Sequence, residues 1–302
     1  MNPAAVTTTA VHPTHPGLRV DRPAWAPSSP CGDECLPPRT TGVSWRLVHR
    51  TLALVTTLLA GVVLLPFLPL FGDERRDRAV GVLFRAVLRA AGIELRLAGE
   101  SGYRTGPGRG VLVVANHLSW IDVVAFGAAE PVRMLSKQEV ADWPLLGGLA
   151  RRCGTLFVDR RGLHGLPAVV AETAGALRAG AVVGVFPEGT TWCGSASGPF
   201  RRAAFQAALD AGVPVRPVRI TLELPGGRPT TAGAFVGDET LWDSVGRVLR
   251  LPGLVCELTL LPALAPVGDR RTLARRAELA VSGTIPSVTT AAPVVGTELA
   301  AG

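Results

Sequence analysis

The sequence predicts an α/β domain in which helices flank a mixed, largely parallel sheet, preceded by a membrane-associated helical segment. Beyond Ile93, short β-branched and apolar runs alternate with stretches of helical periodicity, an order typical of helices packed on such a sheet. An uncharged apolar run, Thr51–Phe71, comes before this pattern, and both chain ends are rich in small residues, Pro and Thr. We therefore expect four regions: a disordered tail (1–44), a membrane-associated helical segment (45–92), the α/β domain (93–283) and a second disordered tail (284–302).

The apolar run is long enough to enter or cross a bilayer. About 21 residues rising roughly 1.5 Å each would reach ~31 Å as a helix, which matches the hydrocarbon core. Pro66 and Pro69 should break the helix near its end, so a kinked, entering segment and a spanning segment both remain open. A buried core helix is the alternative, whereas an ordinary signal peptide would begin earlier in the chain.

Arginines flank the apolar run and are in modest excess after it, which predicts a cell-membrane protein with the domain that follows the run on the cytoplasmic side. The stretch Ala79–Ala91 places arginines and apolar residues at helical spacing. This pattern fits an interfacial helix on acidic headgroups, and it fits equally well an amphipathic helix packed on the domain.

Within the domain, strands and helices are expected in alternation. The expected strands are Ile93–Leu97, Val111–Ala115, Val132–Leu135, Thr155–Val158, Val182–Phe186, Val215–Leu224 and Val255–Leu260. Helices are expected over Leu166–Ala179, Arg201–Ala211 and Arg271–Val281.

Composition narrows the class of partner. The formal charge of +7 and the pI of about 10.1 favour acidic partners, and the low aromatic content counts against nucleic acid. Membrane lipid is therefore the expected partner. The five cysteines show no disulfide framework, and we expect no metal, although the short spacings of two His/Cys pairs in the tail would permit zinc: His12, His15, Cys31 and Cys35.

The first chemical motif is Asn-His-Leu-Ser-Trp-Ile-Asp at 116–122, directly after an apolar strand. It places His117 in a turn and Asp122 in the first turn of the following helix. A histidine held by a carboxylate can remove a proton from an alcohol. Ser119 and Asp122 also fit a capping box, in which case His117 would be a passing loop residue. The spacing alone leaves both interpretations open.

Three further motifs follow in order. Gly-Thr-Leu-Phe-Val-Asp-Arg at 154–160 ends a strand in Arg160, which suits a phosphate but also an ordinary surface ion pair. Phe-Pro-Glu-Gly-Thr at 186–190 puts Glu188 and Gly189 at a strand end, where α/β folds place ligands, or simply forms a tight turn. Val-Pro-Val-Arg-Pro-Val at 213–218 opens another strand.

Together, over about residues 80 to 283, these motifs resemble the glycerolipid acyltransferase family. The resemblance implies that family's fold and transfer of a fatty acyl group to the hydroxyl of a lysophospholipid, most simply 1-acylglycerol-3-phosphate to give phosphatidic acid. It implies that His117 is the general base and that Asp122 orients it. The residues that it assigns to the acceptor and its acyl chain are Gly154, Phe157, Arg160, Glu188, Gly189, Thr190 and Pro214.

The resemblance also implies acyl-CoA or acyl carrier protein as co-substrate, with no cofactor and no acyl-enzyme. The chain departs from the family where an arginine commonly follows Glu-Gly-Thr, because Thr191 stands there; Arg201 or Arg202 could replace it. This departure leaves open another acceptor, such as a lyso-ornithine lipid. An inactive, membrane-anchored lipid-binding protein and a thioesterase that passes the acyl group to water are further alternatives.

Overall fold

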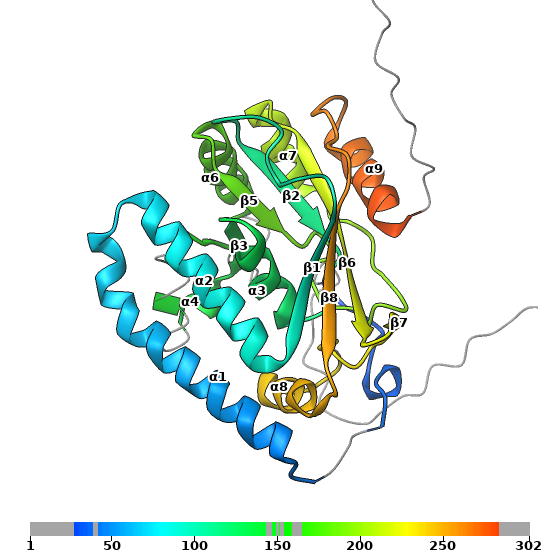
Figure 1. Ribbon diagram of the computed structural model, residues 1–302. Coiled ribbons are helices and arrows are strands. Elements are labelled where there is room, and N and C mark those ends of the chain that lie inside the picture. The colour runs from blue at the N-terminus through cyan, green and yellow to red at the C-terminus, as the bar shows by residue number, and fades with distance from the viewer. Residues whose placement is uncertain are drawn as a thin grey trace, which may run out of the picture.

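The computed structural model describes residues 27–38, 42–142, 147–148, 151, 154–158 and 165–283, and an eight-stranded sheet lies at its centre (Figure 1). The strand order is β1-β8-β6-β2-β5-β3-β4, and β7 pairs with β6. The strands are β1 (Ile93–Gly99), β2 (Val111–Ala115), β3 (Arg133–Lys137), β4 (Leu156–Val158), β5 (Val182–Val185), β6 (Val215–Leu224), β7 (Arg228–Pro229) and β8 (Leu254–Leu260).

The sheet is mixed and largely parallel, which confirms the predicted class. The antiparallel pairs in the described sheet are β6 with β7 and β6 with β8, whereas β6 is parallel to β2 and β8 is parallel to β1. The strands β2, β5, β3 and β4 are parallel to one another, so their carboxyl ends meet at one edge of the sheet. The motifs that begin at Asn116 and Phe186 follow β2 and β5 directly, and they therefore lie side by side at this edge.

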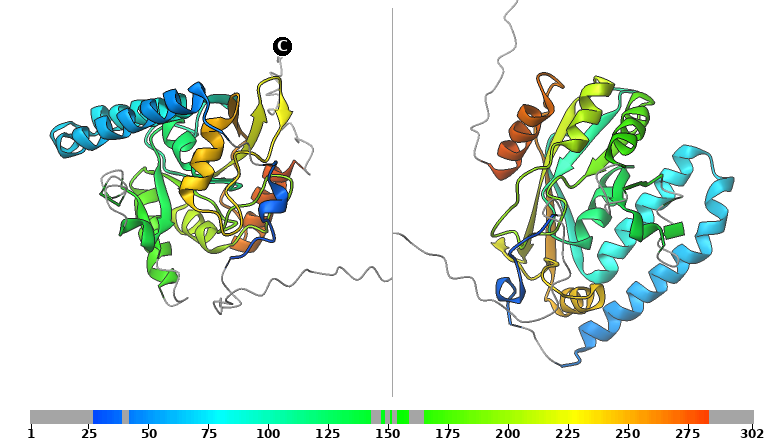
Figure 2. Two further views of the ribbon diagram at one scale, coloured as in Figure 1. Left: turned by 90° about the horizontal axis from the view of Figure 1, so that it is seen from below. Right: turned by 180° about the vertical axis from the view of Figure 1, so that it is seen from behind.

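Helices cover both faces of the sheet, as the two views in Figure 2 show. One face packs against α2 (Asp73–Ala91), α3 (Trp120–Ala129) and α8 (Leu241–Arg250). The other packs against α6 (Leu166–Arg178), α7 (Ala203–Ala211) and α9 (Arg270–Ser282), while the short α4 (Gln138–Ala141) follows β3. Alternate residues of β2 enter the two cores, so this central strand is apolar on both sides.

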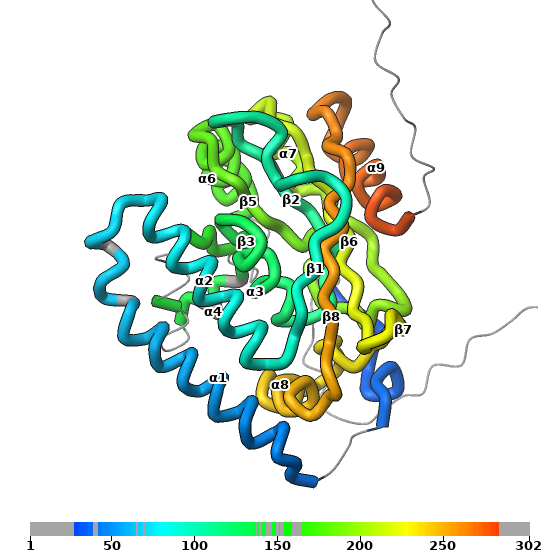
Figure 3. The backbone as a smooth tube through the Cα atoms, viewed as in Figure 1, coloured from blue at the N-terminus to red at the C-terminus, as the bar shows by residue number. Residues whose placement is uncertain are grey.

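The apolar N-terminal segment is a long helix followed by a tighter turn. α1 (Trp45–Leu64) gives way to the 3₁₀ helix η2 (Leu65–Leu70), which contains Pro66 and Pro69, so the expected break is present. α1 is long and apolar enough to cross a membrane, and only 11% of its apolar window is buried. The chain then turns back through α2, and the two helices lie side by side along the domain (Figure 3).

α2 packs on the domain through its contact with α3. A Cβ placed on Gly127 would lie 2.2 Å from the Phe84 ring, so glycine is needed for this close approach. Arg85 Nη1 donates to the Ala128 carbonyl at 2.7 Å, and Arg50 of α1 donates to the Leu251 carbonyl at 2.7 Å. Of the two interpretations of Ala79–Ala91, the structure supports a helix packed on the domain.

Residues 27–38 differ from the expected disordered tail. They lie against the domain and include the short 3₁₀ helix η1 (Asp33–Cys35). Cys31 is only 7% exposed and forms a small apolar cluster with Cys193, Ala234 and Val236, which come from two distant loops. Composition could not reveal this segment's order, because its buried side chains are few and their partners lie far along the chain.

Candidate active site

The turn that carries His117 is fastened to the sheet by Asn116. The Asn116 amide donates to the Ile220 carbonyl at 3.0 Å and accepts from the Ile220 N–H at 2.8 Å, so it pairs with β6 as a strand residue would. This role of Asn116 was not predicted. Its place directly after the last strand residue was the available signal, since a side-chain amide there can continue the ladder of hydrogen bonds.

His117 and Asp122 are brought together as the motif predicted. His117 Nδ1 lies 2.8 Å from Asp122 Oδ2, and that oxygen also accepts from the backbone N–H groups of Leu118 and Ser119 at 2.5 and 2.9 Å. Ser119 in turn caps α3, so a capping box and a histidine–carboxylate pair are present together. Because three donors surround one carboxylate oxygen, the proton of a neutral imidazole belongs on Nδ1, and Nε2 is left as the acceptor.

The imidazole is held on one side and open on the other. Asp122 is fully buried, whereas 20% of the His117 side chain is exposed. The Phe186 ring stacks on the imidazole with centroids 4.1 Å apart and planes 5° from parallel. The Trp192 backbone N–H donates to the His117 carbonyl at 2.8 Å, and this hydrogen bond holds the backbone of the turn. Packing and hydrogen bonds thus set the direction of the ring before any substrate binds.

Glu188 is directed at the backbone of the site. Its Oε2 accepts from the His117 N–H at 2.6 Å, and its Oε1 accepts from the Gly198 N–H at 2.9 Å. Burial raises the pKa of Glu188 to about 7, although these two hydrogen bonds oppose the shift. Both oxygens therefore have partners within the protein. Glu188 therefore holds the backbone of His117, while its predicted contact with the acceptor stays a prediction.

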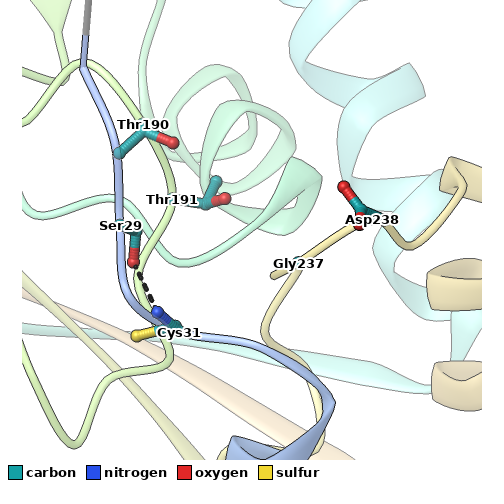
Figure 4. Close-up of a pocket in the computed structure, with 6 residues that line it drawn as sticks. All are labelled: Ser29, Cys31, Thr190, Thr191, Gly237 and Asp238. Carbon is teal, nitrogen blue, oxygen red and sulfur yellow. Dashed lines mark hydrogen bonds between the residues drawn. The ribbon is translucent and has the colours of Figure 1, made fainter. Parts of the chain in front are cut away.

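Gly189 and Thr190 follow Glu188 in the same loop. Gly189 has φ of +77°, and a Cβ there would lie 2.8 Å from Pro27 and 3.5 Å from Arg201 Cδ. Glycine is thus required both by the backbone conformation and by the close approach of the N-terminal segment. Thr190 lines a hollow of about 160 Å³ together with Ser29, Cys31, Thr191, Gly237 and Asp238 (Figure 4).

A second hollow, of about 320 Å³, lies between the loop after Glu188 and strand β6, where Leu118 and Gly194 line it with Ile220 and Thr230. Among the described residues, His117 lines neither hollow. The side of the His117 ring that faces away from Asp122 is the partly exposed one, and neither hollow includes it.

The remaining residues predicted to bind the acceptor or its acyl chain belong to other segments of the chain. Arg160 lies outside the described residues, although β4 ends two positions before it at the same edge of the sheet. Phe157 is on β4 opposite Ser136, and Gly154 lies before the start of that strand. The Pro214 carbonyl accepts from Leu112 N–H at the start of β2, roughly 16 Å of strand from His117. The structure does not bring Gly154 or Pro214 to the catalytic pair.

Thr191 stands where the family commonly has an arginine, and its hydroxyl donates to the Phe235 carbonyl. It therefore holds a neighbouring loop. Arg201 lies closer to the place where the family's arginine is expected. Its backbone N–H donates to the Pro187 carbonyl at 2.9 Å, and its side chain passes Gly189. Arg202 is instead the N-cap residue of α7. Of the two candidate arginines, Arg201 lies against the Glu188 loop.

Comparison with known proteins identifies the family. A family model described as acyltransferase matches residues 96–221, a range that holds all four motifs. A lyso-ornithine lipid O-acyltransferase from Pseudomonas aeruginosa is 40% identical over 189 residues, which are 62% of this chain and 70% of that protein. The chain belongs to the acyltransferase family. This acyltransferase is also 37% identical over 147 residues to a 1-acyl-sn-glycerol-3-phosphate acyltransferase from Neisseria meningitidis, covering 49% of this chain and 56% of that protein.

The fold of this acyltransferase has a solved relative. The 1-acyl-sn-glycerophosphate acyltransferase from Thermotoga maritima matches with a TM-score of 0.60, covering 79% of this chain and 95% of that one. At 18% identity this likeness bears on the fold alone. It agrees with the predicted fold class.

Proposed function

We propose that this acyltransferase moves a fatty acyl group from a thioester to the hydroxyl of a lysophospholipid at a membrane surface, with His117 as the general base. The most direct reaction is conversion of 1-acylglycerol-3-phosphate to phosphatidic acid. The observation that carries the proposal is the contact of 2.8 Å between His117 Nδ1 and the buried Asp122, which leaves Nε2 on the partly exposed side of the ring.

The reaction needs only one proton carrier. His117 Nε2 takes the proton from the acceptor hydroxyl as the oxygen forms a bond to the thioester carbonyl carbon. The carbon–sulfur bond then breaks, and the leaving thiolate receives the proton from the imidazolium. Asp122 stabilises the imidazolium in between, because its carboxylate faces Nδ1–H. The donor is acyl-CoA or acyl carrier protein, and no cofactor or metal takes part in these steps.

The acceptor's headgroup is best placed beside the Glu188 loop. Arg201 lies there, with its Cδ 3.5 Å from a Cβ placed on Gly189, and it carries a guanidinium. An anionic headgroup would be recognised by such a group. A phosphate-free acceptor, a lyso-ornithine lipid, is the second candidate. It is favoured by Thr191, whose hydroxyl is used to hold Phe235 and which offers no positive charge.

The enzyme is membrane-associated, and α1 is the element that accounts for it. Its outward side carries a run of exposed apolar residues that would otherwise face water. They include Trp45, Leu52, Val55, Leu58, Leu59 and Val63. We place the catalytic domain on the cytoplasmic side, as the excess of arginines after α1 favours.

The experiment is an acyl-transfer assay in membranes that contain the wild type, His117→Ala or His49→Ala. His49 is the matched control, since it lies on α1 and outside the site. Labelled acyl-CoA or acyl carrier protein is supplied with lysophosphatidic acid or with lyso-ornithine lipid. We expect labelled phosphatidic acid from the wild type and His49→Ala, and a loss of at least 10²-fold in His117→Ala.

Product from the lyso-ornithine lipid alone would select the second candidate. Equal product from His117→Ala and the wild type would overturn the role of His117. Release of free fatty acid without either acceptor would identify a thioesterase.

A further inference from the structure

Three cysteines from two distant parts of the chain meet beside the active-site loop. Cys31 and Cys35 belong to the segment 27–38, and Cys193 follows the loop that carries Glu188. Cys31 and Cys193 are 162 positions apart, yet the three sulfur atoms all lie within 4.8 Å of one another. Cys31 and Cys193 are buried, at 7% and 4% exposed. No step of the proposed reaction uses these thiols.

Each sulfur atom faces backbone N–H groups. Cys31 Sγ accepts from the Cys193 N–H at 3.4 Å, and Cys35 has a backbone hydrogen bond from Gly32. Cys193 has backbone hydrogen bonds from Ser195 and Ala196, across a turn in which Gly194 has φ of +92°. Such donors stabilise a negatively charged sulfur. Backbone N–H groups thus face all three sulfur atoms, which is the environment that thiolate ligands of a metal ion use.

We propose that Cys31, Cys35 and Cys193 bind a zinc ion as thiolates. Zinc–sulfur bonds of ~2.3 Å in tetrahedral geometry place thiolates roughly 3.8 Å apart, which fits sulfur atoms gathered within 4.8 Å. Three thiolates this close repel one another, and a divalent cation removes that repulsion. A disulfide would use only two of the sulfur atoms and leave the third without a role.

The described residues supply three zinc ligands, so the fourth ligand would be a solvent molecule. Cys31 also borders the hollow of about 160 Å³ shown in Figure 4, but its sulfur points away from Gly237 and Asp238 across that hollow. Asp238 lines the same hollow from the far side, away from the Cys31 sulfur, so its carboxylate is not a ligand in this arrangement (Figure 4). Soft thiolate ligands favour zinc over magnesium or calcium.

The ion would fasten the N-terminal segment to the active-site loop. Cys193 adjoins Trp192, whose N–H donates to the His117 carbonyl at 2.8 Å. In the same segment as Cys31, Pro27 lies against Gly189, at 2.8 Å from a Cβ placed there. Zinc therefore has a structural role, holding the segment 27–38 over the loop that positions His117. It supplies no step of the acyl transfer.

The experiment measures metal in the full-length chain, purified in detergent under reducing conditions with zinc present and then dialysed. We expect about one zinc per chain in the wild type and less than a tenth of that in Cys31→Ser and Cys193→Ser. Cys256→Ala is the matched control, because Cys256 is buried in the sheet and away from the cluster; it should keep its zinc. Cobalt(II) in place of zinc should give a thiolate-to-metal charge-transfer band in the wild type and in Cys256→Ala, and in neither serine variant.

A measurement on the wild type alone guards against variants that fail to fold. Zinc should protect the peptides containing Cys31, Cys35 and Cys193 from alkylation, and a chelator should expose them at least tenfold faster. The proposal is overturned if the wild type holds no zinc, if Cys193→Ser keeps its full zinc, or if the anaerobically isolated chain contains a Cys31–Cys193 disulfide. None of these outcomes depends on the acyl-transfer activity.

Discussion

Asp122 belongs to two local structures at the scale of single residues: it closes the capping box of α3 and it orients His117. We expect Asp122→Asn to lower kcat by roughly 10² to 10⁴-fold with a smaller change in KM, because the amide cannot accept from all three donors and stabilise the imidazolium. Steady-state kinetics with saturating thioester measure this.

Asp243→Asn is the matched control, since Asp243 closes the same kind of capping box at the start of α8. Both variants should lose about 1 kcal/mol of helix stability. Only Asp122→Asn should lose activity. An equal loss of kcat in the two variants would reduce Asp122 to a capping residue.

Arg201 carries the second prediction at this scale. We expect Arg201→Ala to raise KM for lysophosphatidic acid roughly 10- to 100-fold, because a charged hydrogen bond to a phosphate contributes about 1.5–3 kcal/mol. Arg202→Ala is the neighbouring control and should change KM little, as its backbone begins α7. If both variants bind the acceptor as the wild type does, the headgroup is held elsewhere.

At the scale of elements, α1 decides membrane association. Leu52 and Leu59 on α1 are each 61% exposed. We expect Leu52→Glu with Leu59→Glu to lower partition onto liposomes at least 10-fold, because burying each leucine in lipid contributes about 1.5–3 kcal/mol. Co-sedimentation measures the partition, and thermal unfolding should stay close to that of the wild type.

Leu97→Glu, on β1, is the control for this change, since Leu97 is 54% exposed and lies in the sheet. It should leave the partition unchanged. Liposome binding by the α1 double variant at the wild-type level would show that another surface contacts the membrane.

At the scale of the whole molecule, Glu188 makes stability depend on pH. Its pKa is raised from 4.5 to about 7 by burial, so between these values the folded protein holds a proton that the unfolded chain has released. Stability should therefore fall as pH rises from about 4.5 to 7, by on the order of 3 kcal/mol, and this contribution should be constant above that range.

The measurement is chemical unfolding at several pH values between 5 and 8, in the wild type and Glu188→Gln. The difference between the two proteins isolates Glu188 from the other titrating groups. This difference in the free energy of unfolding should vary with pH below 7 and become constant above pH 7. A difference that does not vary between pH 5 and 7 would contradict the raised pKa.

Much of this architecture was readable from local patterns. Strands β2 and β6 have the predicted bounds, and β1, β3, β4, β5 and β8 differ by one or two residues at their ends, because period and β-branched composition act over short distances. The two-residue strand β7 was not predicted. The contact between His117 and Asp122 was also predictable, since the two residues are five positions apart. Helix α8 was not expected, although its Thr240–Asp243 capping box marks its start.

The sequence by itself determined the fold class, the apolar α1 and the motifs that carry the chemistry, because each depends on residues close together in the chain. Only the tertiary structure decided that Glu188 holds the His117 backbone, that Arg201 passes Gly189 and Arg202 does not, and that the three cysteines meet. These contacts join segments tens to hundreds of positions apart. Their partners are set by strand order and loop packing, which local periodicity does not encode.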